Sequence, residues 1–166
     1  TSQILEFSKG HRNTQGLLVY NETIFSTEHG PRGGDEINKI FKGKNYGWPI
    51  VSYGEPYGEN LPQYKFKKNH SENNFEEPLF TFIPSIAPAD IIKIPNNFNP
   101  KWINNYFVAS LNSRSLFRLK FNQNYNGILY IEKILLGERI RDINYDEETN
   151  SFILAIESGE IGVISN

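Results

Sequence analysis

The chain has 166 residues, with 17 lysines and arginines against 19 aspartates and glutamates, and it contains no cysteine. This length suits one domain, and the slightly acidic balance excludes the basic footprint of a nucleic-acid-binding protein. Without cysteine the chain has neither disulfides nor thiolate metal ligands. No apolar run is long enough to cross a membrane, and the first residues do not resemble a signal peptide.

Short apolar segments that alternate with a period of two run along the whole chain and predict β-strands. Aromatic residues, which favour strands, make up 14% of the sequence. No window sustains helical spacing over three turns. The predicted strands are Gln3–Ser8, Gly16–Tyr20, Thr23–Thr27, Glu36–Phe41, Leu79–Ile83, Ile91–Ile94, Tyr106–Leu111, Ser115–Phe121, Leu129–Leu135, Ile140–Tyr145, Phe152–Glu157 and Gly159–Ile164.

These strands group into units of four. One unit runs from Gly16 to Phe41 and closes near residues 79–82, and a second covers residues 90–135. A third begins near residue 139 and stops after three strands. Repeated four-stranded units are typical of β-propeller blades, so an all-β partial propeller is predicted, with about two complete blades plus flanking strands. Its free strand edges would need another chain or a further segment to cover them.

The segment Ser52–Glu77 interrupts the strands and is rich in glycine, proline, asparagine and lysine. Long loops inside a compact domain are usually either functional or disordered. We expect a functional role for Tyr53–Gly58 and a solvated, flexible loop for Tyr64–Asn74.

Two loops gather cationic and polar side chains among glycines, at residues 10–17 and 27–36, and residues 45–49 follow closely. Such loops at the mouth of a rigid β scaffold suit an anionic ligand or a metal. A pair of ordinary hairpin turns with solvated charges is the alternative. Two such motifs in close succession favour the site.

In chain order, these loops resemble consecutive motifs of the soluble pyrroloquinoline quinone (PQQ)-dependent glucose/sorbosone dehydrogenases, particularly the aldose sugar dehydrogenase branch. The motifs that carry the resemblance are Gly10–Leu17, Glu28–Glu36, Lys44–Pro49, Pro84–Pro88 and Arg139–Asp142. The resemblance implies that residues 1–166 are the C-terminal part of a single six-bladed propeller domain. It also implies an oxidoreductase with PQQ and calcium as cofactors, which oxidises aldose sugars to lactones by hydride transfer to the quinone and works in the periplasm or outside the cell.

The resemblance assigns the cofactor contacts to five residues. It places Arg12 near the quinone oxygens as the catalytic cation, with Asn13 beside it and Tyr57 lining the pocket. Arg139 and Arg141 would face the cofactor carboxylates, which planar guanidinium groups bind in a bidentate manner. Because these two arginines are two positions apart on one strand, they share a face. A solvated arginine pair on an edge strand is the alternative.

The resemblance also assigns metal ligands. The carbonyls of Gly30 and Pro31 would bind the calcium linked to the cofactor, and Glu36 with the carbonyl of Tyr46 would bind a second, structural calcium. Calcium prefers several oxygen ligands, and backbone carbonyls are common among them. A plain turn and a solvated carboxylate are the alternatives. His11 and His29 are expected to be hydrogen-bonded scaffold residues.

The chain departs from the family pattern in three ways. The family's catalytic histidine belongs to the N-terminal half, which has no counterpart here, so the chain alone is expected to be inactive. Asn112 stands where the glucose dehydrogenase branch has a cofactor-contacting lysine, and Ile83 stands where a tryptophan stacks.

Besides a sugar substrate, the expected partner is the missing N-terminal half or a second chain, with no nucleic acid and no membrane span. These departures keep a second hypothesis open, a non-catalytic calcium-binding propeller that serves as a binding or interaction module. A lactonase-type calcium propeller hydrolase would rest only on Asn13 with Glu36.

Overall fold

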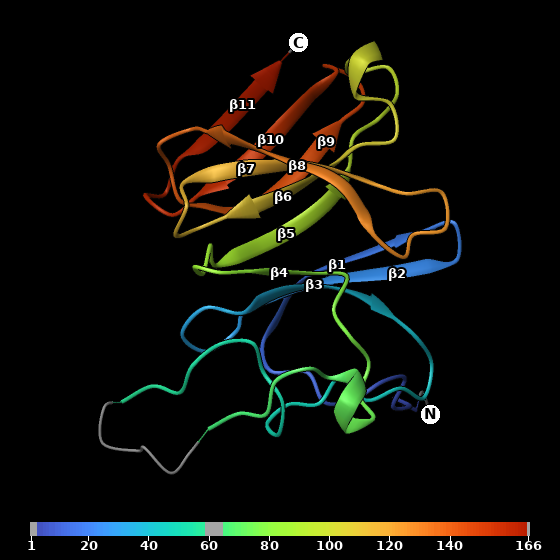
Figure 1. Ribbon diagram of the computed structural model, residues 1–166. Helices are drawn as coiled ribbons and strands as arrows, with labels where there is room; N and C mark the ends of the chain where they lie inside the picture. The colour runs from blue at the N-terminus through green and yellow to red at the C-terminus, as the bar shows by residue number, and fades with distance from the viewer. Residues whose placement is uncertain (1–2, 59–64, 166) are drawn as a thin grey trace.

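The computed structural model describes residues 3–58 and 65–165 (Figure 1). Within these ranges the chain forms three antiparallel sheets and no α-helix, which confirms the predicted all-β class. Two single-turn 3-10 helices, η1 (Ser71–Asn73) and η2 (Pro100–Trp102), lie in connections.

The first two sheets have four strands each, and every strand pairs with its sequence neighbour. The first sheet contains β1 (Thr14–Tyr20), β2 (Thr23–Glu28), β3 (Asp35–Ile40) and β4 (Phe80–Phe82). The second contains β5 (Pro88–Lys93), β6 (Tyr106–Ser110), β7 (Ser115–Phe121) and β8 (Ile128–Leu135). These are the two predicted four-strand units.

The third sheet has three strands, in the order β11–β10–β9. They are β9 (Ile140–Asp146), β10 (Ser151–Ile156) and β11 (Ile161–Ser165). No sheet closes on itself within the described residues. The partial set of four-stranded units agrees with the prediction, whereas a closed ring of six blades lies beyond this chain.

One prediction about an irregular segment is wrong. Residues 3–8 form no strand, because they find no partner strand among the described residues, and Ile4 and Leu5 are exposed. Most of residues 65–74 are exposed, as predicted for a solvated loop, but the segment is anchored to the scaffold, since Lys67 bridges to Val51 and His70 is only 1% exposed. Tyr64 lies outside the described residues.

Aromatic side chains fill the spaces between adjacent sheets. Phe25 of β2 stacks on Phe121 of β7 at a ring distance of 4.6 Å, and Tyr106 meets Phe121 at 4.9 Å. Between the second and third sheets, Phe152 packs against Phe107 at 5.1 Å. The first strands of the sheets also lie side by side, β1 against β5 and β5 against β9. The sheets therefore form one rigid scaffold on which the loops are held.

The antiparallel order brings alternate connections to opposite ends of the sheets. The β4–β5 connection lies on the left of Figure 1 and the β1–β2 turn on the right. The chain has six arginines, and five belong to the left end, which we name the arginine end. They are Arg12, Arg32, Arg114, Arg139 and Arg141.

The opposite end carries the β1–β2 turn, the connection before β6 and the β7–β8 loop. We name it the tyrosine end, after Tyr20, Tyr106 and Tyr125. Every residue that the sequence predicted for the cofactor or a metal lies in or near the loops at or below the arginine end, so the fold positions these residues on one side of the scaffold.

Candidate functional site

A small cavity of about 10 Å³ lies beneath the loops of the arginine end. Its walls include the carboxylates of Glu28 and Glu36, the ring of His70 and the residues Tyr46 and Gly30. A space of this size holds about one water-sized particle. The cavity therefore has the dimensions of a single-ion site rather than of an organic ligand site.

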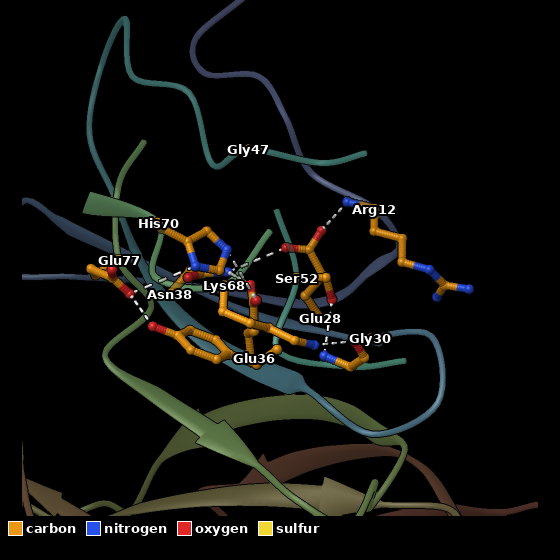
Figure 2. A network of polar contacts seen from close by, with 12 residues as sticks. Arg12, Glu28, Gly30, Glu36, Asn38, Gly47, Ser52, Lys68, His70 and Glu77 are labelled. Carbon is orange, nitrogen blue, oxygen red and sulfur yellow. Dashed lines mark hydrogen bonds and ion pairs between the residues drawn. The ribbon is translucent and has the colours of Figure 1, made fainter. Parts of the chain in front are cut away.

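A buried polar network surrounds this cavity (Figure 2). The side-chain amide of Asn38 donates to Glu28 Oε1 at 3.2 Å and to Glu36 Oε2 at 3.0 Å. His70 Nε2 lies 3.6 Å from Glu36 Oε1, and His70 Nδ1 lies 3.6 Å from a carboxylate oxygen of Glu77. Asn38 Oδ1 and His70 Nδ1 are buried without a hydrogen bond, so the network has unsatisfied polar atoms.

Among the described residues no lysine or arginine pairs with Glu28 or Glu36, and only imidazole rings lie close: His11 Nδ1 is 3.5 Å from Glu28 Oε1, and His70 faces Glu36. Burial, together with the nearby charges of Glu28, Glu77 and Asp35, raises the pKa of Glu36 to about 8. Burial also lowers the pKa of His70, although Glu77 and Glu28 oppose this, so the ring stays neutral near pH 7. Glu36 therefore favours a proton or an added cation near neutral pH.

The donor set fits a hard cation such as calcium, which takes carboxylate and backbone oxygens. Glu36 and Tyr46, predicted to share one calcium, line the same cavity. Among residues 3–58 and 65–165, no group of three or more acidic, histidine or cysteine side chains lies close enough to hold a metal. Backbone carbonyls would therefore have to complete the coordination of any cation here.

The loop between β2 and β3 is folded tightly enough to crowd carbonyl oxygens together. A side chain at Gly30 would lie 2.2 Å from the Gly33 oxygen and 2.3 Å from the Gly34 oxygen, so only glycine fits. The Pro31 carbonyl accepts a hydrogen bond of 2.6 Å from the Tyr57 hydroxyl. Gly30, Pro31 and Tyr57, all predicted to lie at the cofactor, are thus brought together.

One carboxylate holds this loop in place. Asp35 is fully buried and accepts from the Gly30 amide through Oδ1 at 2.9 Å. Its Oδ2 accepts from the Ser85 hydroxyl and from the amides of Ile86 and Ala87, at 2.5, 2.8 and 2.8 Å. Asp35 therefore ties the β2–β3 loop to the β4–β5 turn.

Arg12 has the surroundings of an anion-binding group. Its guanidinium donates to the His29 carbonyl at 3.0 Å and lies 5.2 Å from the Trp48 ring and 5.8 Å from the Tyr57 ring. Its Nε is buried without a hydrogen-bond partner. The backbone amides of Arg12 and Asn13 both donate to Glu28 Oε2, so this carboxylate also positions the predicted cofactor loop.

Arg139 and Arg141 lie at the same end but in the third sheet. Both form ion pairs with Glu157, so the two side chains share a face of the strand, as predicted. These arginines also lower the pKa of the Glu157 carboxyl. Asp142 faces the other way toward Asp90, whose pKa is raised to about 6 by burial and by Asp142. Among the described residues, no hydrogen bond, ion pair or ring contact joins this arginine pair to Arg12.

A groove of about 470 Å³ opens between the β4–β5 turn and the β6–β7 loop. Ile83 and Asn112, the two departures from the family pattern, both line it, and Asn112 donates to the Ser85 carbonyl at 2.9 Å. Lys133 of β8 lines the same groove. The family's lysine is replaced by Asn112 in this chain, but Lys133 supplies a lysine to the same groove.

Sequence reasoning correctly treated His11 and His29 as hydrogen-bonded residues. His11 Nε2 lies 2.9 Å from the Ser8 hydroxyl, and His29 Nε2 lies 2.7 Å from the Pro88 carbonyl. It missed Asn38, His70 and Lys133. Asn38 could have been found, because it stands two positions after Glu36 on one strand and so shares its face. No comparable signal marks His70, which lies in an irregular loop.

Successive antiparallel sheets that pack face to face, each built from strands adjacent in sequence, define the chain as an all-β protein of the propeller type. Comparison with known proteins narrows this class to one family. The model of the glucose/sorbosone dehydrogenase family matches residues 2–164. The chain belongs to this family.

Three similar proteins illustrate the match. The Escherichia coli aldose sugar dehydrogenase is 31% identical over 96% of this chain and 43% of its own length. The Acinetobacter calcoaceticus quinoprotein glucose dehydrogenase B is 31% identical over 72% of this chain and 23% of its own length. A crystal structure of a glucose dehydrogenase superposes with a TM-score of 0.81, at 31% identity, over 95% of this chain and 45% of that one.

The chain therefore spans less than half the length of these relatives. No helix among the described residues is long and apolar enough to span a membrane.

Proposed function

We propose that this chain is the cofactor-binding part of a PQQ- and calcium-dependent dehydrogenase that oxidises aldose sugars to lactones. One observation carries the proposal: the Arg12 guanidinium, with an unpartnered buried Nε, lies 5.2 and 5.8 Å from the Trp48 and Tyr57 rings and lines a single-ion cavity. The names of the two relatives support it, since one is an aldose sugar dehydrogenase and the other a quinoprotein glucose dehydrogenase.

Each residue of the site has a defined part in the proposal. PQQ, when bound, supplies the electron acceptor that takes hydride from the anomeric carbon of the sugar. Arg12 would donate hydrogen bonds to a quinone oxygen and would stabilise the negative charge that develops there. Tyr57, whose ring lies 5.8 Å from the Arg12 guanidinium, and Asn13, the next residue along the chain, would line the same pocket. Arg139 and Arg141 are the candidates for the cofactor carboxylates, in competition with Glu157.

Calcium would occupy two positions. The carbonyls of Gly30 and Pro31 would hold the ion that contacts the cofactor, and Glu36 with the carbonyl of Tyr46 would hold the buried one. The buried ion would neutralise Glu28 and Glu36, with which no lysine or arginine among the described residues forms an ion pair. Because Glu28 also anchors the Arg12 and Asn13 amides, loss of this ion would loosen the cofactor loop.

Some features of the proposal lie outside these 166 residues. The general base that takes the anomeric hydroxyl proton belongs to the family's N-terminal half, so we expect no sugar turnover from this chain by itself. The same N-terminal half, or a second chain, would complete the six-bladed ring and cover the exposed edge residues Ile161 and Val163 of β11. A periplasmic or secreted location is proposed for the complete protein.

The experiment that tests the proposal is a PQQ titration of the natural polypeptide that carries this chain, with calcium present and followed by calorimetry. Saturable binding that weakens on chelation of calcium supports the proposal. Absence of PQQ binding to the complete polypeptide would overturn it and would leave the non-catalytic interaction module as the remaining function.

A further inference from the structure

A second cavity, of about 370 Å³, lies at the tyrosine end, on the far side of the scaffold from Arg12. The β1–β2 turn, the connection before β6 and the β7–β8 loop form its walls. Small-molecule sites usually have volumes of ~300–1,000 Å³. Both sheets that border the cavity belong to this chain, and none of the residues that line it bears on the proposed dehydrogenase reaction.

The chemistry of this cavity is amide and phenol. Its lining includes the rings of Tyr20, Tyr106 and Tyr125 and the side-chain amides of Asn21, Asn104 and Gln123. These three amides have no hydrogen-bond partner among the described residues. Asn122 differs, because its amide is used within the β7–β8 loop, where it accepts from the Asn126 amide at 3.1 Å.

The cavity is nearly uncharged. Lys120 is the one charged residue among its described lining residues, and no carboxylate is present there. Burial and a hydrogen bond with Tyr125 raise the pKa of Tyr106, so its hydroxyl stays protonated. The arginine end, by contrast, carries five guanidinium groups. A ligand with several negative charges therefore has far less to bind at the tyrosine end than near Arg12.

The walls of the cavity are supported from below. The Tyr125 ring packs 5.6 Å from Phe25 and 6.0 Å from Phe121, and Tyr20 packs 6.3 Å from Tyr106. The turn residues Asn21 and Asn104 have φ angles of 46° and 60°. Backbones held in this left-handed region place both asparagines at the rim of the cavity, on turns that the packed aromatic rings support.

The geometry points to a saccharide-binding site at the tyrosine end, built for an uncharged sugar ring. A hydroxyl group both donates and accepts hydrogen bonds, and a primary amide offers both functions within one side chain. The half-buried rings of Tyr20 and Tyr125 add rigid, amphipathic surface for the apolar face of a sugar, while Tyr106, only 1% exposed, supports them from the core. The site is distinct from the dehydrogenase centre and would hold a non-reacting sugar unit.

The test uses the natural polypeptide and three neutral probes that cannot be oxidised at the anomeric carbon, the methyl glycosides of glucose, galactose and mannose. Ligand-observed NMR measures their dissociation constants, with methyl glucuronide as the charged counterpart. At least one neutral glycoside is expected to bind in the millimolar range and more tightly than the glucuronide. If none binds more tightly than about 10 mM, or if the glucuronide binds best, the inference is wrong.

A double variant locates the binding. Asn21→Gly with Asn104→Gly removes two amides without strain, because glycine readily adopts positive φ. The matched control is Asn74→Gly with Asn150→Gly, at φ angles of 62° and 51° outside the cavity. We expect the first variant to raise the dissociation constant of the glycoside about tenfold and the control to change it less than about twofold. Equal effects of the two variants would overturn the inference.

The proposed function and the saccharide site can each be refuted without affecting the other. Arg12→Ala is expected to leave glycoside binding at the tyrosine end unchanged, and the double Asn→Gly variant is expected to leave PQQ binding unchanged. Thermal unfolding of every variant confirms that it folds. Loss of glycoside binding in Arg12→Ala would place the sugar at the dehydrogenase centre instead and would reject the second site.

Discussion

The arginine end and the tyrosine end are built on the same strands, yet their loops differ in charge and in what holds them. At the arginine end, buried carboxylates organise the loops: Asp35 ties two of them together, and Glu28 anchors the amides of Arg12 and Asn13. At the tyrosine end, turns with positive φ present neutral amides over an aromatic core. The sheets thus supply rigidity to both ends, while the loops alone decide which ligand chemistry each end can serve.

The largest expected effect comes from removing Asp35, one of the buried carboxylates that distinguish the arginine end from the tyrosine end. Asp35→Ala would leave the Gly30 and Ile86 amides without an acceptor and the Ala87 amide with only the Ser85 hydroxyl at 3.3 Å, and we expect the free energy of unfolding to fall by about 3–5 kcal/mol. Urea denaturation measures this loss. Glu147→Ala, at the exposed β9–β10 turn near the tyrosine end, is the control and is expected to leave the midpoint almost unchanged. Similar losses in the two variants would show that buried carboxylates do not organise the arginine end.

The next effect concerns the pH dependence of stability in calcium-free protein. The pKa of Glu36 in the folded state, about 8, exceeds its usual value of 4.5, so folding favours the protonated form. This stabilisation is complete below about pH 4.5 and is lost as pH rises through 8. We expect the free energy of unfolding to fall between these values by on the order of a few kcal/mol.

Glu36→Gln should remove most of this pH dependence, and calcium should restore stability at pH 8 in the wild type only. Chemical denaturation at pH 5 and pH 8, with a chelator or with calcium, gives the comparison. Glu22→Gln, at the exposed β1–β2 turn, is the matched control. An unchanged pH dependence in Glu36→Gln would contradict the assigned role of the buried carboxylate.

A smaller effect is expected from the lysines that line a cavity at each end. Lys133→Gln removes a cation from the groove that also contains Ile83 and Asn112, and we expect PQQ affinity to fall about three- to tenfold. Lys120→Gln, at the tyrosine end, should leave PQQ affinity unchanged. Calorimetric titration of both variants measures the difference, and equal affinities would show that Lys133 does not contact the cofactor.

The smallest effect belongs to Glu157, which is paired with Arg139 and Arg141 at the surface. Exposed ion pairs add little stability, so Glu157→Gln is expected to leave the unfolding midpoint nearly unchanged. It should, however, tighten PQQ binding about two- to threefold, since both arginines lose a competing carboxylate. Weaker PQQ binding in this variant would show instead that Glu157 positions the two arginines.

Much of the fold followed from the sequence, because period-two alternation and turn residues mark antiparallel strands directly. All predicted strands from Gly16 onward have a counterpart in the sheets. Residues 3–8 show the limit of this reasoning, since alternation predicts a pleated segment but cannot supply the neighbouring strand that it must pair with. His70 is buried and anchors the loop of residues 65–74, and no local sequence pattern predicts this burial.

The loop residues of the candidate site could be predicted from the sequence, but the buried polar network beneath them could not. Arg12, Gly30, Pro31 and Tyr57 belong to motifs or loops that the sequence singled out, and the structure brings them together. The burial of Glu36 and its network with Asn38 and His70 depend on the packing of β3 against the distant loop that carries His70. The cavity at the tyrosine end was invisible for the same reason, because its walls come from separate turns that only the fold brings together.

The measurement that tests the central claim most directly is the affinity of PQQ for the natural polypeptide and its Arg12→Ala variant, each with calcium and with a chelator. Arg32→Ala, which removes an exposed arginine at the same end, is the control. We expect Arg12→Ala to weaken PQQ binding about a hundredfold, chelation to weaken it in the wild type, and Arg32→Ala to change it less than about threefold. Equal PQQ affinity in the wild type and in Arg12→Ala would contradict the claim that the arginine end is the cofactor site.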